Sequence, residues 1–314
     1  MNSFLFSDDN KRYHTWNYYL RHKFNSKVVK VALNAGFTCP NRDGKKGFGG
    51  CTFCNDVGSG NFTQPSSMDL LDQYHAGREV MEKKWPNSLT IPYFQSYTNT
   101  YGSLKRIKEC LQPFLTLDEV VAIAIGTRAD CLEQEKLDYL NECCKTKEIW
   151  IEIGLQSKYD STAKAINRGH NFDEFVDCIN RIKKTNCKVC VHLINGLPGE
   201  TKEMMIETAK ACNALDIDAV KIHMLHITKN TQLFRSYEKL PFHILTRDEY
   251  VDIVCDQLKE LKPTIIIQRL TGDAIKEELI EPAWTLKKTI VLNEIDKKMA
   301  RENITQGMNT TWKI

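Results

Sequence analysis

Most of this chain alternates between short runs rich in β-branched residues and longer stretches with the apolar spacing of amphipathic helices. Strands separated by helices form βαβ units, whose strands pair in parallel. Six strands are predicted, at residues 28–34, 89–95, 119–126, 148–155, 188–195 and 218–226. Residues 264–270 are a candidate for a seventh strand. Six units are too few for a closed eight-strand barrel, so we expect an α/β fold, a partial (β/α)6 barrel that stays open.

Helical spacing is clearest in residues 68–84, 201–215, 247–261 and 290–301. Thr201 follows a Pro-Gly-Glu turn and is the predicted N-cap of its helix. We expect three parts: a basic, aromatic N-terminal extension (1–26), the partial barrel (27–285), and a C-terminal helix and tail (286–314).

The 314-residue chain has no apolar run of about 18 residues, so no membrane span is expected. Its first ten residues lack a basic start followed by an apolar stretch, so no secretory signal is expected either. We therefore expect a cytoplasmic protein, in which thiols stay reduced. The 12 cysteines then need an explanation other than disulfides.

The first 55 residues carry nine Lys and Arg against three Asp, although the whole chain has a net charge of only +3. Aromatic residues are interspersed with these charges: Tyr13, Trp16, Tyr18, Tyr19 and Phe24. Basic plus aromatic residues suit nucleic acid, because cations pair with phosphates and rings stack on bases. The alternative is a solvated arm whose aromatic residues cap the core.

Polar residues follow the end of each predicted strand. Because parallel strands end at one edge of the barrel, these residues are expected to meet in one site. They are the cysteine loop (39–54), Gln95 to Thr100, Thr127 to Asp130, Gln156 and Ser157, Asn195 to Glu200, His223 and His226, and Arg269 to Asp273.

The cysteine loop has the spacing C-x11-C-x2-C, formed by Cys39, Cys51 and Cys54, with four glycines inside it. A structural zinc site needs a fourth ligand, and no nearby pair supplies one at a usual spacing. An iron–sulfur cluster is the favoured interpretation, because three thiolates leave one iron with an open position for another ligand. Three unrelated buried thiols are the remaining alternative.

Most other cysteines lie in apolar or helical patterns and are expected to be small core residues. Cys143 and Cys144 are adjacent on a predicted helix, so their side chains diverge. Cys187 and Cys190 have the spacing of a metal or redox pair, but a strand would place them on opposite faces.

The cysteine loop, with Phe53 before its last cysteine, resembles that of radical S-adenosylmethionine (SAM) enzymes. The longer spacing resembles that of the Elongator-type branch. It resembles more closely that of the YtqA/YhcC-like family, which belongs to the branch that modifies the wobble uridine of tRNA. The segments that carry this resemblance are residues 36–44, 93–95, 98–101, 154–157, 167–170, 192–200, 269–273 and 282–285. They span nearly the whole chain.

The resemblance implies a TIM-like partial barrel of the radical SAM type that uses a 4Fe–4S cluster and SAM. Cys39, Cys51 and Cys54 would hold the cluster. His192 stands where porphyrin-oxidising relatives tend to have Asp, so a satisfied core histidine is its alternative. The residues implied in SAM binding are Phe53, Gln95, Thr98, Asn99, Gln156, Arg168, His192, Ile194, Gly196 and Leu225.

The resemblance further implies action on the wobble uridine 34 of tRNA, from 5-carboxymethylaminomethyluridine to 5-aminomethyluridine. No acetyltransferase domain is expected, since about 30 residues follow Trp284. The expected partners are tRNA and an electron donor such as flavodoxin or ferredoxin, with no membrane. Two alternatives stay open: a small-molecule or peptide substrate, and a non-enzymatic zinc module. Arg128, Lys221 and Arg269 are candidates for binding substrate, and Tyr97, His226 and Asp273 are candidate catalytic residues.

Overall fold

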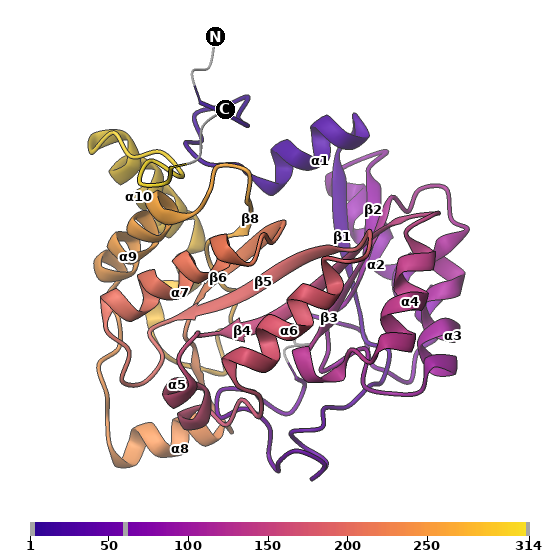
Figure 1. Ribbon diagram of the computed structural model, residues 1–314, viewed down its shortest axis with the longest axis horizontal. Coiled ribbons are helices and arrows are strands. Elements are labelled where there is room, and N and C mark those ends of the chain that lie inside the picture. The colour runs from indigo at the N-terminus through magenta and orange to yellow at the C-terminus, as the bar shows by residue number, and fades with distance from the viewer. Residues whose placement is uncertain (1–3, 59–61, 312–314) are drawn as a thin grey trace.

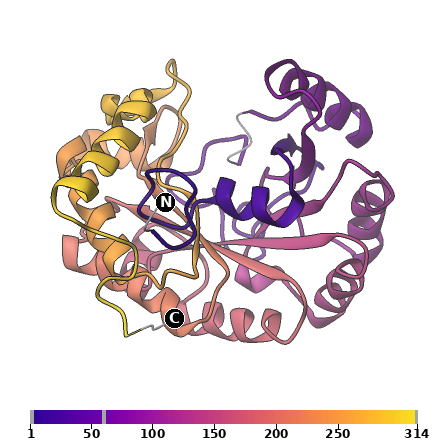
Figure 2. The same cartoon turned by 90° about the horizontal axis from the view of Figure 1, so that it is seen from above.

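The computed structural model describes residues 4–58 and 62–311. These residues form one sheet of seven parallel strands that curls into an open half-barrel (Figures 1 and 2). The sheet order is β1 (Val28–Leu33), β2 (Leu89–Phe94), β3 (Ala122–Thr127), β4 (Glu148–Gln156), β5 (Lys188–Asn195), β6 (Ala219–Met224) and β8 (Ile266–Arg269). The predicted α/β half-barrel is therefore confirmed, and the candidate seventh strand completes it. The predicted strand ends differ from the observed ones by at most three residues.

The helices between successive strands cover the outer face of the sheet (Figure 2). They are α2 (Leu70–Lys84), α3 (Leu104–Leu115), α4 (Gln134–Cys143), α6 (Phe172–Ile182), α7 (Lys202–Ala214) and α9 (Arg247–Glu260). Thr201 caps α7 as expected, because its side chain accepts a hydrogen bond from the backbone of Met204. Capping boxes at Asn171 and Thr246 fix the starts of α6 and α9.

The remaining elements are short or peripheral. The last helix, α10 (Lys288–Arg301), packs against α9. The others are α5 (Asp160–Ala165), α8 (Gln232–Lys239), the antiparallel pair β7 (Ile227–Thr228) and β9 (Leu279–Glu281), and the 3-10 turns η1 (Ala129–Cys131) and η2 (Ala283–Lys287). Within the described ranges, no helix is both long enough and apolar enough to cross a bilayer.

The first helix, α1 (Trp16–Phe24), closes the half-barrel at the N-terminal ends of its strands. It contacts β1 and β8, the two edges of the sheet. Trp16 and Tyr19 stack on each other and meet the buried Trp150 of β4 edge-on, at ring-centroid distances of 4.8 and 5.8 Å. The helix therefore forms a floor under the inner face of the sheet.

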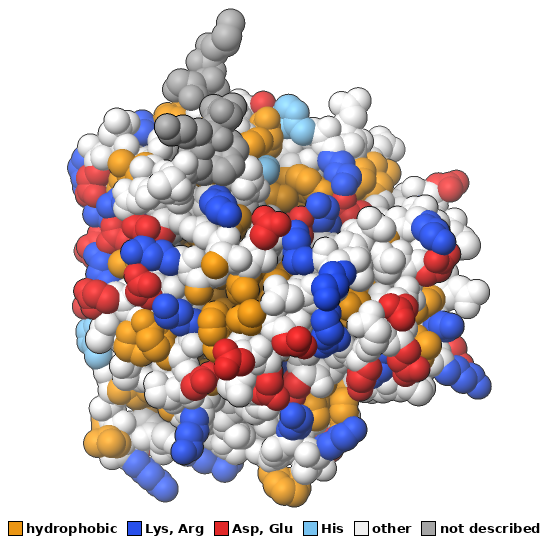
Figure 3. Space-filling model, in the orientation of Figure 1, with side chains coloured by type: hydrophobic (Ala, Val, Ile, Leu, Met, Phe, Trp, Pro, Cys, Tyr) orange, Lys and Arg blue, Asp and Glu red, His pale blue; other side chains and the backbone are white. Residues whose placement is uncertain are grey.

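This packing changes the interpretation of the basic, aromatic N-terminus. The rings of Trp16, Tyr19 and Phe24 pack on the inner apolar cluster of the sheet, and Tyr13 is buried in the main core. These four rings pack in or against the core, as the alternative interpretation expects. They are not free to stack on RNA bases. On the face in Figure 3, acidic side chains are interspersed with basic ones.

The structure separates the packing cysteines from the loop cysteines. The helical and strand thiols expected in the core are buried: Cys110, Cys131, Cys178, Cys212 and Cys255. Cys187 faces the helices and Cys190 faces the inside of the barrel, so the two are not a pair. Cys187 instead lies 3.5 Å, sulfur to sulfur, from Cys144.

Candidate active site

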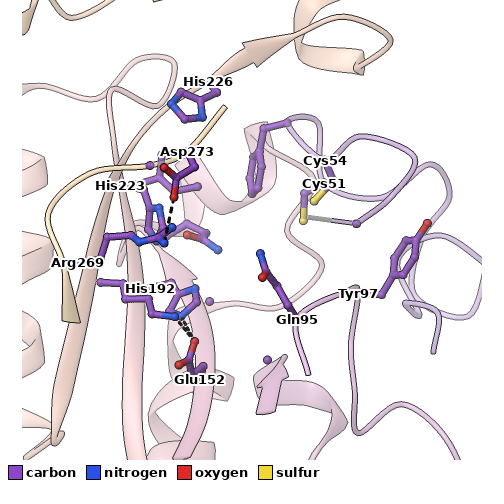
Figure 4. Close-up of a pocket in the computed structure, with 18 of the residues that line it drawn as sticks. Cys51, Cys54, Gln95, Tyr97, Glu152, His192, His223, His226, Arg269 and Asp273 are labelled. Atoms are coloured by element: carbon purple, nitrogen blue, oxygen red, sulfur yellow. Dashed lines mark hydrogen bonds and ion pairs between the residues drawn. The ribbon is translucent and has the colours of Figure 1, made fainter. Parts of the chain in front are cut away.

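A cavity of about 660 Å³ runs inside the half-barrel from the floor helix to the cysteine loop (Figure 4). Its lower wall consists of inward-facing strand residues, among them Lys30, Tyr93, Glu152, Lys221 and Gln268. Its upper wall consists of residues that follow the strand ends. Six of the seven predicted polar segments contribute to this cavity, but none of the residues from Asn195 to Glu200 lines it.

All three loop cysteines line this cavity, and Cys51 is buried. The loop is tied to the segment after α5: the Asn167 amide donates to the carbonyl of Gly50 over 2.8 Å. Gly49 and Gly50 both have positive φ, and a Cβ on Gly50 would lie 3.2 Å from the Arg42 side chain. Glycine is therefore needed where the loop turns back on itself.

Two arginines surround Cys51. One guanidinium nitrogen of Arg168 lies 3.7 Å from the Cys51 sulfur. A hydrogen bond from Cys54, together with the positive charges of Arg168 and Arg128, lowers the pKa of Cys51 to about 5. The loop thus favours a thiolate, the form in which cysteine binds metals.

The donor set fits an iron–sulfur cluster. Three thiols share one cavity wall, and two of them, Cys51 and Cys54, are hydrogen-bonded neighbours. In the described part of the chain, no three His, Cys, Asp or Glu side chains already stand together as a metal site. Cys39 therefore lines the cavity, but the three sulfurs do not lie close enough together to form a ready metal site. Cluster coordination by three thiolates leaves one iron open toward the same cavity.

Eight of the ten residues implied in SAM binding line the cavity: Phe53, Gln95, Thr98, Gln156, Arg168, His192, Ile194 and Leu225. Asn99 is not among the lining residues, because its amide donates to the carbonyls of Phe94, Ser96 and Gly126. Gly196 is also outside the lining, packed near Leu245. The Asn99 side-chain oxygen is buried without a partner, and the role of Asn99 and Gly196 in SAM binding stays a prediction.

Two lining residues have unusual backbones. Tyr97 and Gln156 have φ values of +58° and +71°, in the left-handed region that costs a residue with a side chain about 1–2 kcal/mol. The pairing of β4 with β5 also shifts register between Gly154 and Gln156. Strain and bulges of this kind gather at binding sites.

The candidate substrate and catalytic residues line the cavity, but their partners differ. Arg128 makes two bonds to Asp130 and one to the carbonyl of Arg168, so its guanidinium serves mainly to join these loops. Arg269 is 3.2 Å from Asp273, which also pairs with Lys288. The Nε2 atom of His226 is buried without a protein partner, and the Tyr97 hydroxyl donates to the carbonyl of Asp56.

The lower part of the cavity contains a charge network that the sequence analysis did not identify. Glu152 is 1% exposed and pairs with Lys30, Lys221 and His192. Burial alone raises the pKa of Glu152, but the charges of Lys221 and Lys30 and the hydrogen bond from His192 lower it well below its usual range. Burial lowers the pKa of Lys221 to about 8 and that of His192 to about 4.

His192 therefore lines the cavity, where a SAM-binding residue is expected, and is also a hydrogen-bonded histidine, as its alternative interpretation expects. The residues missed in the sequence are Lys30, Glu152 and Gln268. A clear signal was present only for Lys30, the one polar residue of β1, whereas Glu152 and Gln268 share their strands with other polar residues.

Two family profiles match most of this chain. The radical SAM superfamily profile matches residues 38–212, and the profile of the radical SAM C-terminal domain matches residues 217–301. The chain is 45% identical to YtqA of Bacillus subtilis (strain 168) over 306 residues, which is 98% of this chain and 95% of YtqA.

Two further similarities concern part of the chain or the fold alone. Over 138 residues, or 43% of this chain and 25% of the relative, it is 28% identical to the tRNA uridine(34) acetyltransferase of Methanocaldococcus infernus. The structure of the Methanocaldococcus infernus Elp3 lacking its N-terminus superimposes with a TM-score of 0.66 at 18% identity, covering 90% of this chain and 64% of that one. The chain therefore belongs to the radical SAM superfamily, whose members use a 4Fe–4S cluster and SAM, and within it to the YtqA/YhcC-like family.

Proposed function

We propose that this radical SAM enzyme modifies the wobble uridine of tRNA. It would convert 5-carboxymethylaminomethyluridine to 5-aminomethyluridine. The observation that carries this proposal is the cationic lower cavity, where Arg269 and the buried Lys221 line the same cavity as the loop cysteines. A substrate with a carboxylate suits such a cavity through charge-assisted hydrogen bonds. The partial similarity to a tRNA uridine(34) acetyltransferase supports RNA as the carrier of this group.

The cluster and SAM, when bound, supply a 5′-deoxyadenosyl radical that removes a hydrogen atom from an unactivated carbon. The three loop cysteines would hold the cluster, and we assign Thr98, Gln156 and Arg168 to SAM. The remaining cavity, toward Lys221, would place the substrate and exclude water during the radical step.

The proposed reaction removes the carboxymethyl group as a two-carbon fragment. Removal of a hydrogen atom and of one further electron at the carboxymethyl carbon would give an imine. The iron–sulfur cluster, when bound, would accept that electron. Addition of water to this imine breaks the carbon–nitrogen bond. The products are the aminomethyl nucleoside and glyoxylate, so the atoms and electrons balance without another oxidant. A reducing cytoplasm with a flavodoxin or ferredoxin as donor fits an oxygen-sensitive cluster.

The test is an anaerobic incubation of tRNA carrying 5-carboxymethylaminomethyluridine with holoenzyme, SAM and reductant, followed by nucleoside analysis. We expect 5-aminomethyluridine, glyoxylate and 5′-deoxyadenosine to form together. Cys51→Ala should remove the activity, and a cell carrying only that variant should accumulate the carboxymethyl nucleoside. Cys212→Ala is the matched control, because Cys212 is fully buried in the core and should leave the iron content unchanged. Cleavage of SAM with an unchanged nucleoside would contradict the proposal and favour a small-molecule or peptide substrate.

A further inference from the structure

The lower cavity contains buried polar atoms that the protein leaves without partners. The Nε2 atoms of Gln268 and His223 are both buried, and neither has a hydrogen-bond partner in the described structure. Both residues line the cavity beside Glu152 and Lys221 (Figure 4 labels His223 and Glu152). Buried polar groups are normally hydrogen-bonded, and leaving one unpaired costs about 1–3 kcal/mol. Unpaired atoms that face one cavity therefore indicate a ligand.

The amide of Gln268 is held in one orientation. Its oxygen accepts a hydrogen bond of 3.0 Å from the ammonium of Lys30. The same ammonium pairs with Glu152 over 2.5 Å, and Glu152 pairs with Lys221. Since an ammonium can only donate, the Gln268 oxygen must face Lys30 and the NH2 group must face away from it. The unpaired NH2 group is thus a positioned donor.

The charges around these atoms do not cancel. Lys30 and Lys221 share the single carboxylate of Glu152, which leaves one positive charge in a buried space. The positive charge of Arg269 also acts on His223, and after burial it is the largest influence that keeps the pKa of His223 well below its usual range. His223 is therefore a neutral hydrogen-bonding group among cations. An uncompensated buried cation is costly, so the chamber suits an anion.

We propose that Lys221 and the amide of Gln268 bind the carboxylate of the substrate in this chamber, with His223 as the neutral partner of the adjacent amine. This inference rests on the proposed function and deepens it. Trp16 of the floor helix lines the lower end of the cavity, and the loop cysteines line its other end. The chamber is formed by inward-facing strand residues, so a carboxylate at the end of a flexible substituent suits it better than a backbone phosphate of RNA. The product lacks the carboxylate, so the chamber distinguishes substrate from product.

The test compares the binding of two anticodon stem-loop RNAs to anaerobic holoenzyme with SAM and without reductant, so that no turnover occurs. One RNA carries 5-carboxymethylaminomethyluridine at position 34 and the other carries 5-aminomethyluridine. We expect the wild type to bind the carboxylate RNA about tenfold or more tightly, the usual effect of a hydrogen bond to a charged group. Gln268→Leu should remove most of this preference. Gln134→Leu, on the exposed side of α4, is the matched control and should keep it.

Gln268→Glu is the second variant, for the case that the leucine variant does not fold. It adds a carboxylate beside Lys30 and should also remove the preference, because the chamber then contains its own anion. Equal wild-type affinities for the two RNAs, or a preference that survives in a folded Gln268 variant, would overturn the chamber. A clear preference without conversion on adding reductant would overturn the proposed reaction and leave the chamber standing. Conversion of the RNA on adding reductant, without a preference in binding, would overturn the chamber and leave the proposed reaction standing.

Discussion

Gln156 shows how a single residue reports on binding. Its backbone is left-handed, its side-chain oxygen is buried without a partner, and it follows a shift in strand register. A Cβ on Gly154, two residues earlier in β4, would lie 2.4 Å from the Gln156 amide and 2.9 Å from the Arg168 guanidinium. Two uncommon backbone requirements thus place two side chains against the cavity. We attribute this strained arrangement to the binding of SAM.

This interpretation gives a prediction for Gln156→Gly. Glycine accepts a positive φ, so the free energy of unfolding should change by no more than about 1 kcal/mol. The affinity for SAM should fall about tenfold or more, because a hydrogen-bonding side chain is lost. Thermal denaturation and anaerobic equilibrium dialysis with SAM measure the two effects. Asn87→Gly, at an exposed residue with φ of +58°, is the matched control and should leave SAM binding unchanged. Unchanged SAM affinity in Gln156→Gly would contradict the assignment.

At the scale of elements, α1 links the fold to the cavity. Trp16 lines the cavity and also packs on Tyr19 and Trp150, while the Lys30 ammonium lies 5.3 Å from its ring. Tyr19 donates a hydrogen bond of 2.9 Å to Glu148, at the start of β4. The helix is therefore a structural floor that also fixes one end of the substrate chamber.

We predict that Trp16→Ala destabilises the protein by about 2–4 kcal/mol, somewhat below the usual cost of truncating a fully buried tryptophan. The loss should appear in urea unfolding as a lower midpoint with an unchanged slope. Arg21→Ala is the control, because Arg21 is exposed on the same helix and should change stability by less than about 0.5 kcal/mol. If the two variants are equally stable, α1 does not serve as a floor.

Much of this architecture was predictable from the sequence, because strand and helix periodicities are local. The alternation placed β1 to β6, and the turn before Thr201 marked the start of α7. The lower cavity was not predictable in the same way. Lys30 and Gln268 are 238 residues apart, and only the curvature of the sheet brings them to one hydrogen bond. Lys30 is the one polar residue of an apolar strand and Gln268 directly precedes Arg269, and neither pattern alone indicates a partner.

For the whole molecule, the most general electrostatic feature is the burial of its histidines. Burial is the largest cause of a lowered pKa in five of the eight: His14, His170, His192, His223 and His226. Burial lowers the pKa of His14 and that of His226 from the ordinary value of 6.5 to about 4. In the folded protein these imidazoles stay neutral at mildly acidic pH. The stability of the fold is therefore expected to depend on pH, and for His14 this dependence arises away from the cysteine loop.

The direction of this dependence follows from proton linkage. Below pH 6.5 the histidines of the unfolded chain take up protons, while His14 in the folded protein takes one up only near pH 4. The unfolded state then binds more protons, so the free energy of unfolding falls as the pH is lowered through this window. Each unit of pKa difference contributes about 1.4 kcal/mol per histidine, so the total loss should reach several kcal/mol. The lowered pKa of Glu152 extends the loss to still lower pH.

His14→Gln tests this proton linkage at a site remote from the cysteine loop. The Gln side chain does not titrate, so the variant should lose about 2–3 kcal/mol less stability than the wild type between pH 7 and pH 4. Urea unfolding at several pH values measures the difference, and effects common to both proteins, such as loss of the cluster, cancel in the comparison. His22→Gln is the control, because His22 is exposed on α1 beside Asp8. A variant whose stability falls with pH as steeply as that of the wild type would show that His14 takes up its proton without opening the fold.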